Sequence, residues 1–372
     1  METKKKGFPA AFWVCACTEI FERLAYYLGR SLILIFVTAS VATGGLGLSD
    51  TVAANMQSNL TAFSYLLPLF GAVIVDKYIG ARYTTPVGMF IAAAGYFTGG
   101  IAKSSAGVYA MIFLVSLGLA LFKNGAIIGR VITDKSQMDP AFSMRYTLVN
   151  VGAFIGTFLV GILYKDVFAK DGVLGFAPCF KMAALMMVLG GLWYIFVCWR
   201  FLGDLGKLPF KKTLTEEEKA AEAKKKEETG TKQPLTTIEK KRIGAIFVAS
   251  LFSIVFWIFW YLGYMPVYFY WAENMDWVVA GYQVPSTWFD AANSLFCVIL
   301  GPVTAALWKK LAARPQGDMS LFRKTGLGIA IIGVGYLFYA AIDIMRGGEK
   351  ASVLWLIVFA FLLTMGEMFF SP

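Results

Sequence analysis

The chain has 372 residues, of which 58% are hydrophobic and only 16% are charged. Soluble domains carry about 25% charged residues, so this composition excludes an ordinary soluble protein and favours one that lies in a lipid bilayer. Lysine and arginine outnumber aspartate and glutamate by 34 to 24, giving a formal charge of +10, and there is no histidine. Without histidine, the most common general base and metal ligand, any proton chemistry must use carboxylates, lysine or tyrosine.

The five cysteines form no C-x-x-C pair and are interpreted as small buried apolar residues, not as a disulfide or zinc framework. The sequence also contains no G-x-S-x-G motif, no H-E-x-x-H motif and no paired aspartates. We therefore expect that the chain is not an enzyme and that it binds no metal and no other cofactor.

Apolar runs of helical length recur along the whole chain. A bilayer core about 30 Å thick needs about 20 apolar helical residues, and ten such runs are present. Glycine and proline at most junctions argue against a β-barrel. The sequence thus predicts an all-α membrane protein with ten transmembrane helices, at 11–38, 51–75, 84–102, 107–132, 142–164, 176–201, 243–270, 286–308, 322–345 and 352–372.

Basic residues are distributed unevenly between the two sides of these helices. The N-terminus and every second loop carry 25 lysines and arginines, whereas the alternate loops carry 6. Because cytoplasmic loops retain basic residues, the N-terminus and residues 203–242 are predicted to be cytoplasmic. Loop charge accounts for the net charge, so no nucleic-acid partner is expected. Three cations are left inside the predicted spans, namely Arg23, Arg30 and Lys123.

Residues 203–242 are the one long polar stretch. They include the helix-capping pattern Thr215-Glu-Glu-Glu218 but no apolar face, which is typical of a solvated linker. The predicted domains are a six-helix bundle at 1–202, a cytoplasmic linker at 203–242 and a four-helix bundle at 243–372. A weak repeat between 68–82 and 302–314 indicates duplication. Six plus six helices around a charged linker is a transporter plan, and here the second six lack two.

The first predicted helix carries charged residues that are costly in a bilayer unless they face a polar interior. At about 100° per residue, five polar residues share one narrow face of this helix. We expect this polar stripe to face a cavity between helices, with Glu19 paired to Arg23 one turn away. The alternative is a buried ion-pair network that only fixes helix packing. The five residues of the stripe are Glu19, Glu22, Arg23, Tyr26 and Arg30.

Further polar side chains lie in other predicted spans, namely Tyr65, Lys123, Asn150, Asn293 and Glu367. The first half supplies cations and the second half a lone carboxylate, which suits a short peptide, a zwitterion whose ends lie about 7 to 10 Å apart. We predict that Arg30 and Lys123 bind the peptide carboxylate. We predict that Glu367 and Asn293 bind the amine.

The segment Glu19-Ile-Phe-Glu-Arg23, followed by Tyr26-Tyr27 and Arg30, closely resembles the E-x-x-E-R-F-x-Y-Y-x-x-R signature of proton-dependent oligopeptide transporters. This is the POT or PTR family of the major facilitator superfamily. Further matches follow in the family's order at 65–71, 75–82, 121–123, 142–154, 288–293 and 366–372. The resemblance runs from Ala11 to the end, apart from the linker. It implies a major-facilitator-type helix bundle.

The resemblance also implies roles for individual residues. Residues that couple proton movement to peptide binding would be Glu19, Glu22, Arg23 and Lys123. Residues that contact the peptide would be Tyr26, Tyr27, Arg30, Tyr65, Lys123, Asn150, Asn293 and Glu367. Trp257 and Tyr261 are candidates for lining the pocket. In this scheme an ionised Glu22 or Glu19 pairs with Arg23 or Lys123, and protonation frees the cation for a substrate carboxylate.

Three features depart from the family pattern. Tyr261 stands where relatives usually carry a glutamate in the seventh span. Asn124 and Ser294 replace the prolines that follow Lys123 and Asn293, so different helix bends are expected there. The chain also ends without the last two helices, and we interpret it as a truncated sequence or a fragment of a longer protein.

The function that the resemblance implies is a proton-coupled symporter that imports di- and tripeptides by alternating access. We expect it to be a monomer in the plasma (inner) membrane, with short peptides, protons and the lipid bilayer as its partners. Two alternatives are open: a family member that carries nitrate, another small anion or an amino-acid conjugate, and a non-transporting truncated paralogue. Glu367 argues against a simple anion carrier. Asp290 and Asp343 are expected near helix ends, within reach of water.

Overall fold

The computed structural model describes residues 7–134, 137–210, 236–264, 266–317 and 319–370. Within these ranges the regular structure is helical apart from four strands of two residues each. The predicted capping pattern at Thr215 and the polar run that follows it lie outside the described residues.

The described residues form two compact units. The first contains residues up to Phe210 together with Trp277–Val298, and the second contains the described part of Lys211–Asp276 together with Ile299–Pro372. The predicted domain boundaries at 202 and 242 stay a prediction. The helices of the first unit are α1 (Ala10–Thr38), η1 (Val41–Thr43), α2 (Asp50–Lys77), α3 (Ala81–Ile101), α4 (Ser105–Leu121), α5 (Asn124–Val131), α6 (Met138–Ile162), η3 (Leu163–Val167), α7 (Phe176–Trp193), η4 (Tyr194–Cys198) and α8 (Trp199–Leu202).

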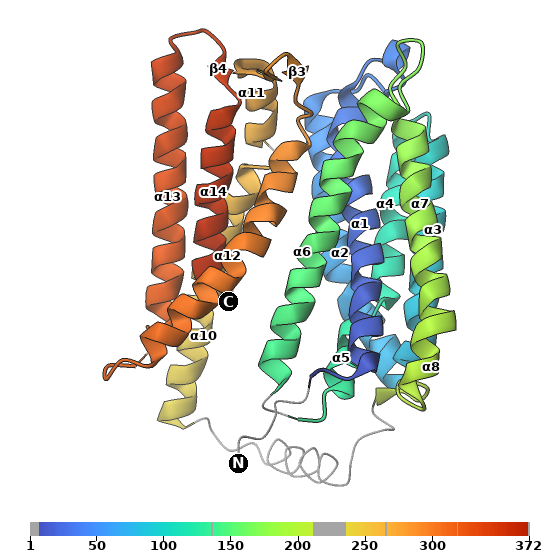
Figure 1. Ribbon diagram of the computed structural model, residues 1–372, viewed down its shortest axis with the longest axis vertical. Coiled ribbons are helices and arrows are strands. Elements are labelled where there is room, and N and C mark those ends of the chain that lie inside the picture. Colours follow the sequence, from blue (N-terminus) through green and yellow to red (C-terminus); the bar gives the residue numbers. More distant parts are fainter. Residues whose placement is uncertain (1–6, 135–136, 211–235, 265, 318, 371–372) are drawn as a thin grey trace. The chain divides into compact units, whose positions relative to one another are not determined.

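The second unit contains α10 (Thr237–Leu262), α11 (Pro266–Asn274), α13 (Leu321–Arg346) and α14 (Leu354–Phe370), and α12 (Trp288–Ala312) begins in the first unit and ends in the second. Each of the ten predicted spans coincides with one helix or with consecutive helices (Figure 1). The predicted all-α membrane bundle is therefore confirmed.

Seven stretches of the described chain are long and apolar enough to cross a membrane, judged by length and composition. They are Asp50–Lys77, Ser105–Val131, Pro140–Val167, Phe176–Leu202, Thr237–Leu262, Trp288–Trp308 and Phe322–Arg346. The charged stripe keeps α1 out of this set, and α14 has only 17 residues. In α3, glycine, threonine and proline lower the mean hydropathy. Charge in α1, length in α14 and residue composition in α3, and not the lack of a helix, separate these three from the seven.

The seventh span differs from its predicted bounds of 243–270. α10 begins earlier, because Thr236 and Glu239 form a capping box in which the Thr236 N–H donates to Glu239 Oε2 at 2.8 Å and the Glu239 N–H donates to Thr236 Oγ1 at 3.3 Å. The helix ends at Leu262, and Pro266 starts a new helix, since proline suits the first turn of a helix but not its interior. Hydropathy marks only the apolar part of a helix and misses a polar first turn.

The fourth predicted span is interrupted. α4 ends at Leu121 and α5 begins at Asn124, because Phe122 (φ −74°, ψ 98°) and Lys123 (φ −117°, ψ 32°) leave helical geometry. Lys123 thus precedes a short helix, and Asn124 is that helix's first residue. α5 also packs against α1. The break brings these two polar residues to the part of the unit that holds the stripe.

The structure contains two small strand pairs that were not predicted. β2 (Val278–Val279) and β3 (Tyr282–Gln283) form an antiparallel hairpin. Its turn residues, Ala280 (φ 50°) and Gly281 (φ 81°), both have positive φ, as a type I′ turn requires. In the second unit β1 (Met275–Asp276) pairs in parallel with β4 (Ala351–Ser352). Strands of two residues are too short to show an alternating pattern.

The hairpin is attached to the first unit through η3. The Lys165 ammonium donates to the Gln283 carbonyl at 2.6 Å, and the Tyr282 hydroxyl donates to Asp166 Oδ2 at 3.0 Å. The Trp288 indole, at the start of α12, stacks on Phe158 of α6 with ring centroids 4.6 Å apart. These contacts explain why residues 277–298 group with the first half of the chain.

The five cysteines are all free, and four of them are buried. Cys15 of α1 and Cys198 of η4 lie in one apolar core cluster with Phe12 and Tyr194. The Cys198 thiol donates to the Val14 carbonyl at 3.3 Å. Four of the five cysteines are thus buried as expected, and Cys17 is half-buried.

α1 lies close to α6 because glycine occupies two successive turns of α6. A Cβ atom at Gly156 would lie 2.5 Å from the Leu24 carbonyl oxygen, and a Cβ atom at Gly152 would lie 2.8 Å from the Ile20 carbonyl oxygen. These distances are far below van der Waals contact. The two glycines therefore set the spacing between the helices that carry the polar contacts described below.

Replacing Gly156 by alanine should lower the melting temperature of the purified protein, because α1 and α6 must separate to admit the methyl group. Overpacking of this kind costs about 1 to 3 kcal/mol. Thermal unfolding in detergent, followed by tryptophan fluorescence, measures the change. Gly244→Ala in α10 is the matched control: nothing lies within 4 Å of a Cβ there, so alanine should leave stability unchanged or raise it by at most about 1 kcal/mol. Equal melting temperatures for the two variants would contradict the close approach.

Candidate functional site

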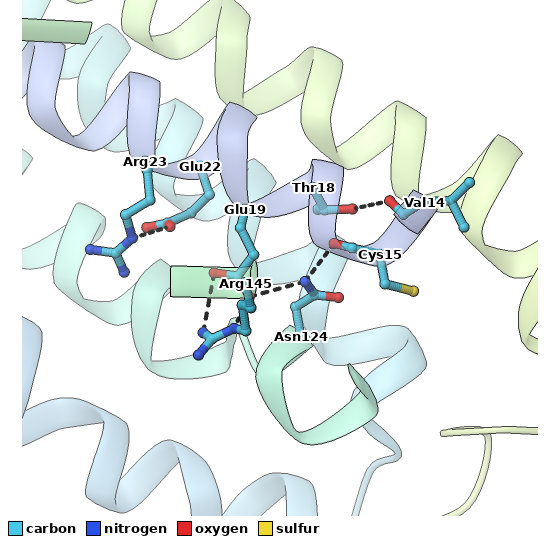
Figure 2. Close-up of polar contacts among 8 residues, drawn as sticks. All are labelled: Val14, Cys15, Thr18, Glu19, Glu22, Arg23, Asn124 and Arg145. Atoms are coloured by element: carbon cyan, nitrogen blue, oxygen red, sulfur yellow. Dashed lines mark hydrogen bonds and ion pairs between the residues drawn. The ribbon is translucent and has the colours of Figure 1, made fainter. Parts of the chain in front are cut away.

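Glu19 is fully buried and is held by side chains from two other helices (Figure 2). Arg145 of α6 donates from Nε to Glu19 Oε1 at 3.0 Å and from Nη2 to Oε2 at 3.2 Å. Asn124 of α5 donates to Oε1 at 3.1 Å and to the Cys15 carbonyl at 2.8 Å. A two-pronged arginine contact with an added hydrogen bond offsets much of the cost of burying a carboxylate.

The predicted pair between Glu19 and Arg23 is therefore wrong. Arg145 stands at the start of the predicted span 142–164, where it was expected to belong with the cytoplasmic loop cations, but α6 begins at Met138 and so places Arg145 about two turns inside the helix. Arg145 lies seven residues, about two turns, before Gly152, and so faces α1 as that glycine does. This spacing is the signal in the sequence that identifies the missed partner.

Glu22 pairs instead with its neighbour in the chain. Glu22 Oε2 lies 2.7 Å from Arg23 Nε, and the side chain of Glu22 is 0% exposed whereas that of Arg23 is 30% exposed. Glu22 Oε1 is buried and has no hydrogen-bond partner among the described residues. Burying an ionised oxygen without a partner is costly, and the Arg23 charge offsets part of that cost. The pair thus joins a buried carboxylate to a cation that is partly accessible.

The next two turns of α1 combine arginine with tyrosine. The Arg23 guanidinium lies 5.4 Å from the ring centroid of Tyr26, and the Arg30 guanidinium lies 5.7 Å from that of Tyr27. Tyr26 and Arg30 are buried, and Tyr27 is half-buried. Cation–π contacts of this kind orient each guanidinium against a ring. Five of the six predicted residues of α1, from Glu22 to Arg30, are thus joined by successive contacts, and Glu19 is held apart from them by Arg145 and Asn124.

Asp290 is an acidic residue near this group that was not among the predicted site residues. It lies in the first turn of α12, as predicted for a residue near a helix end, and it is half-buried. Its carboxylate is next to Ser31 and within electrostatic range of Arg30. Asn293 follows one turn later and is half-buried. No local pattern in the sequence links α12 to α1, so only the tertiary structure brings Asp290 to Arg30.

The other predicted residues of the first unit bind main-chain carbonyls or are exposed. Lys123 donates to the Pro68 carbonyl at 2.9 Å, and no ion pair joins it to a carboxylate in the described part of the chain. Asn150 is buried and donates to the Tyr146 carbonyl at 3.0 Å. Tyr65 of α2 is 70% exposed. Lys123 is therefore a cation whose charge is not balanced by direct contact with an acid.

Glu367, Trp257 and Tyr261 belong to the second unit. Glu367 of α14 is buried, and Trp257 and Tyr261 lie one turn apart on α10 with ring centroids 5.9 Å apart. Phe256 of α10 stacks on Phe370 of α14 at 3.9 Å, which holds these two helices together. The place of these three residues in one site with those of the first unit stays a prediction.

Comparison with known proteins adds independent information. Residues 200–372 match the family described as the POT family. The chain is 24% identical to the uncharacterized transporter YclF of Bacillus subtilis strain 168, over 98% of this chain and 80% of that protein. It is 23% identical to a di-/tripeptide transporter of Lactococcus lactis subsp. cremoris, over 98% of this chain and 82% of that protein.

The structure is similar to a crystal structure of a mutant of a peptide transporter POT in complex with sulfate. The TM-score is 0.85 at 24% identity, over 99% of this chain and 82% of that one. The similarity confirms the predicted major-facilitator-type fold and, with the seven apolar stretches, a multi-pass integral membrane protein. The three proteins named in these comparisons are transporters and not enzymes.

Proposed function

We propose that the chain belongs to the POT family and that it is a proton-coupled symporter that imports di- and tripeptides by alternating access. The observation that supports this best is the Glu22–Arg23 pair in α1. A buried carboxylate in contact with a partly exposed cation forms a unit in which protonation of the acid frees the cation. We also propose a monomer in the plasma membrane, with the N-terminus and residues 203–242 in the cytoplasm.

In the proposed cycle, Glu22 is ionised and holds Arg23 when no substrate is bound. A proton from the outside neutralises Glu22 and cancels its attraction for Arg23, which then becomes available to a substrate carboxylate. The net charge of the buried group stays constant, because the proton and the carboxylate arrive together. Release of both on the inside restores the pair. Glu19 and Lys123 complete the proposed coupling set.

The substrate contacts follow from charge. Together with the freed Arg23, Arg30 and Lys123 would bind the peptide carboxylate, and Glu367 with Asn293 would bind its amine. Arg30 is suited to this role because it lies over the Tyr27 ring, which limits the orientations of its guanidinium. The remaining proposed contacts are Tyr26, Tyr27, Tyr65 and Asn150, with Trp257 and Tyr261 lining the pocket.

The test is uptake of labelled di-alanine into vesicles that contain the purified chain. With an inward gradient of one pH unit and the membrane potential clamped, each coupled proton supplies about 1.4 kcal/mol, which supports about tenfold accumulation. A protonophore should abolish this accumulation. Competition by unlabelled tripeptide but not by nitrate supports the proposal. Competition by nitrate alone would favour the anion carrier, and no flux under any condition would favour the non-transporting paralogue.

A further inference from the structure

Tyr96 of α3 carries a buried hydroxyl group that the proposed cycle does not use. Its side chain is 1% exposed, and its ring packs so closely on Gly29 of α1 that a Cβ atom there would collide with Cε1. The hydroxyl has no hydrogen-bond partner among the described residues. Buried tyrosine hydroxyls usually have a partner, so this one requires a physical explanation.

Glu22 presents a complementary group. Its Oε1 atom is buried and also has no hydrogen-bond partner in the described ranges, although Oε2 contacts Arg23. Glu22 and Arg23 are among the groups that act electrostatically on the Tyr96 hydroxyl. Glu22 and Gly29 are seven residues apart, about two turns, so they lie on the same face of α1. That face is the one that Tyr96 contacts.

We propose that one buried water links the Tyr96 hydroxyl to Glu22 Oε1 by hydrogen bonds, and that Tyr96 thereby sets the proton affinity of Glu22. The proposal rests on the coupling role proposed above for Glu22. A hydroxyl group donates to an ionised carboxylate and accepts from a protonated one, so it serves both states of the cycle. Tyr96 would act through Glu22 as a positioning residue and would not touch the substrate.

Other groups also act on Glu22, and the effect of Tyr96 must be separated from theirs. Arg23, Arg145 and Glu19 carry charges that act on Glu22. Tyr65 of α2 acts on Tyr26 and Tyr27. Each of these groups is left intact when only the Tyr96 hydroxyl is removed, so that single change isolates its contribution.

Tyr96→Phe should raise the proton affinity of Glu22, because a hydroxyl donor stabilises the ionised carboxylate more than the neutral acid. The pH of half-maximal di-alanine uptake should move upward by about one unit. Tyr194→Phe in η4 is the matched control. Tyr194 is also a fully buried tyrosine, but the groups that act on its hydroxyl are Cys15, Cys198, Thr85 and Arg82, and Glu22 is not among them. Its profile should not move, and equal shifts in both variants, or none in Tyr96→Phe, would overturn the proposal.

A second measurement does not depend on transport. Infrared titration of the purified chain follows the stretch of protonated carboxyl groups, and the band that disappears in Glu22→Gln belongs to Glu22. Its midpoint should move upward by about one pH unit in Tyr96→Phe. An unmoved midpoint would refute the role of Tyr96 even with normal uptake. A moved midpoint in a chain that shows no uptake would support the hydrogen bond and refute the proposed function.

Discussion

Replacing Glu22 by glutamine is expected to abolish gradient-driven accumulation while leaving exchange of substrate across the membrane intact. Glutamine keeps the shape of the side chain but cannot lose or gain a proton, so Arg23 stays permanently available to substrate. In vesicles with an inward gradient of one pH unit, the accumulation ratio should fall from about ten to about one. Counterflow, in which unlabelled peptide inside drives labelled peptide inward, should persist because it needs no net proton movement.

The matched control is Glu273→Gln, which makes the same chemical change at an exposed position in α11. It should accumulate di-alanine as the unaltered chain does. Accumulation unchanged in Glu22→Gln would remove Glu22 from the coupling mechanism. Loss of both accumulation and counterflow would assign Glu22 to substrate binding or to folding instead.

Replacing Arg145 by methionine is expected to destabilise the protein strongly, because the Glu19 carboxylate stays buried and Asn124 is the one polar partner left to it among the described residues. Removing one member of a buried ion pair costs about 3 to 5 kcal/mol. The Arg145 side chain is 30% exposed, so water already weakens the pair and the lower end, about 3 kcal/mol, is expected. The melting temperature of the purified protein in detergent measures the loss.

Two controls make this result specific. The double variant Glu19→Gln with Arg145→Met should melt above Arg145→Met alone, because it removes the unpaired charge. Lys207→Met breaks an exposed pair with Asp204, which has a separation of 2.6 Å, and should leave the melting temperature unchanged. The Lys207 ammonium holds the pKa of Asp204 below its ordinary value, so the pair is formed and the comparison is fair. If Arg145→Met behaved like Lys207→Met, the pair with Glu19 would have no structural importance.

The helices themselves could be predicted from the sequence because membrane insertion depends on the composition of local segments. Runs of apolar residues located all ten spans. The predicted helix ends were wrong where backbone geometry or helix capping determines where a helix begins or breaks. The hydropathy pattern did not show the break at Lys123, and the polar first turn of α10 has no apolar signal. Such features depend on hydrogen bonds between residues three or four positions apart. Averaging the hydropathy over a long window hides them.

The polar stripe of α1 could likewise be predicted, because helical periodicity alone places Glu19, Glu22, Arg23, Tyr26 and Arg30 on one face. The interaction partners of these residues could not be predicted. An acidic residue in a helix often has more than one cation within a turn or two along the sequence. Local spacing therefore favoured Arg23 as the ion-pair partner of Glu19. In the folded protein Arg145 reaches Glu19 from α6, because Gly152 and Gly156 allow the two helices to approach.

The sequence by itself thus determined the class of protein, the positions of its helices and the face of α1 that carries charge. Only the tertiary structure decided that Arg145 and Asn124 hold Glu19, that Asp290 lies within electrostatic range of Arg30 and that Tyr96 packs on Gly29. The physical reason is that hydropathy and periodicity are local properties of the chain. The partner of a buried charge depends on which distant helix packs against it and how closely, and that is fixed by shape complementarity across the whole unit.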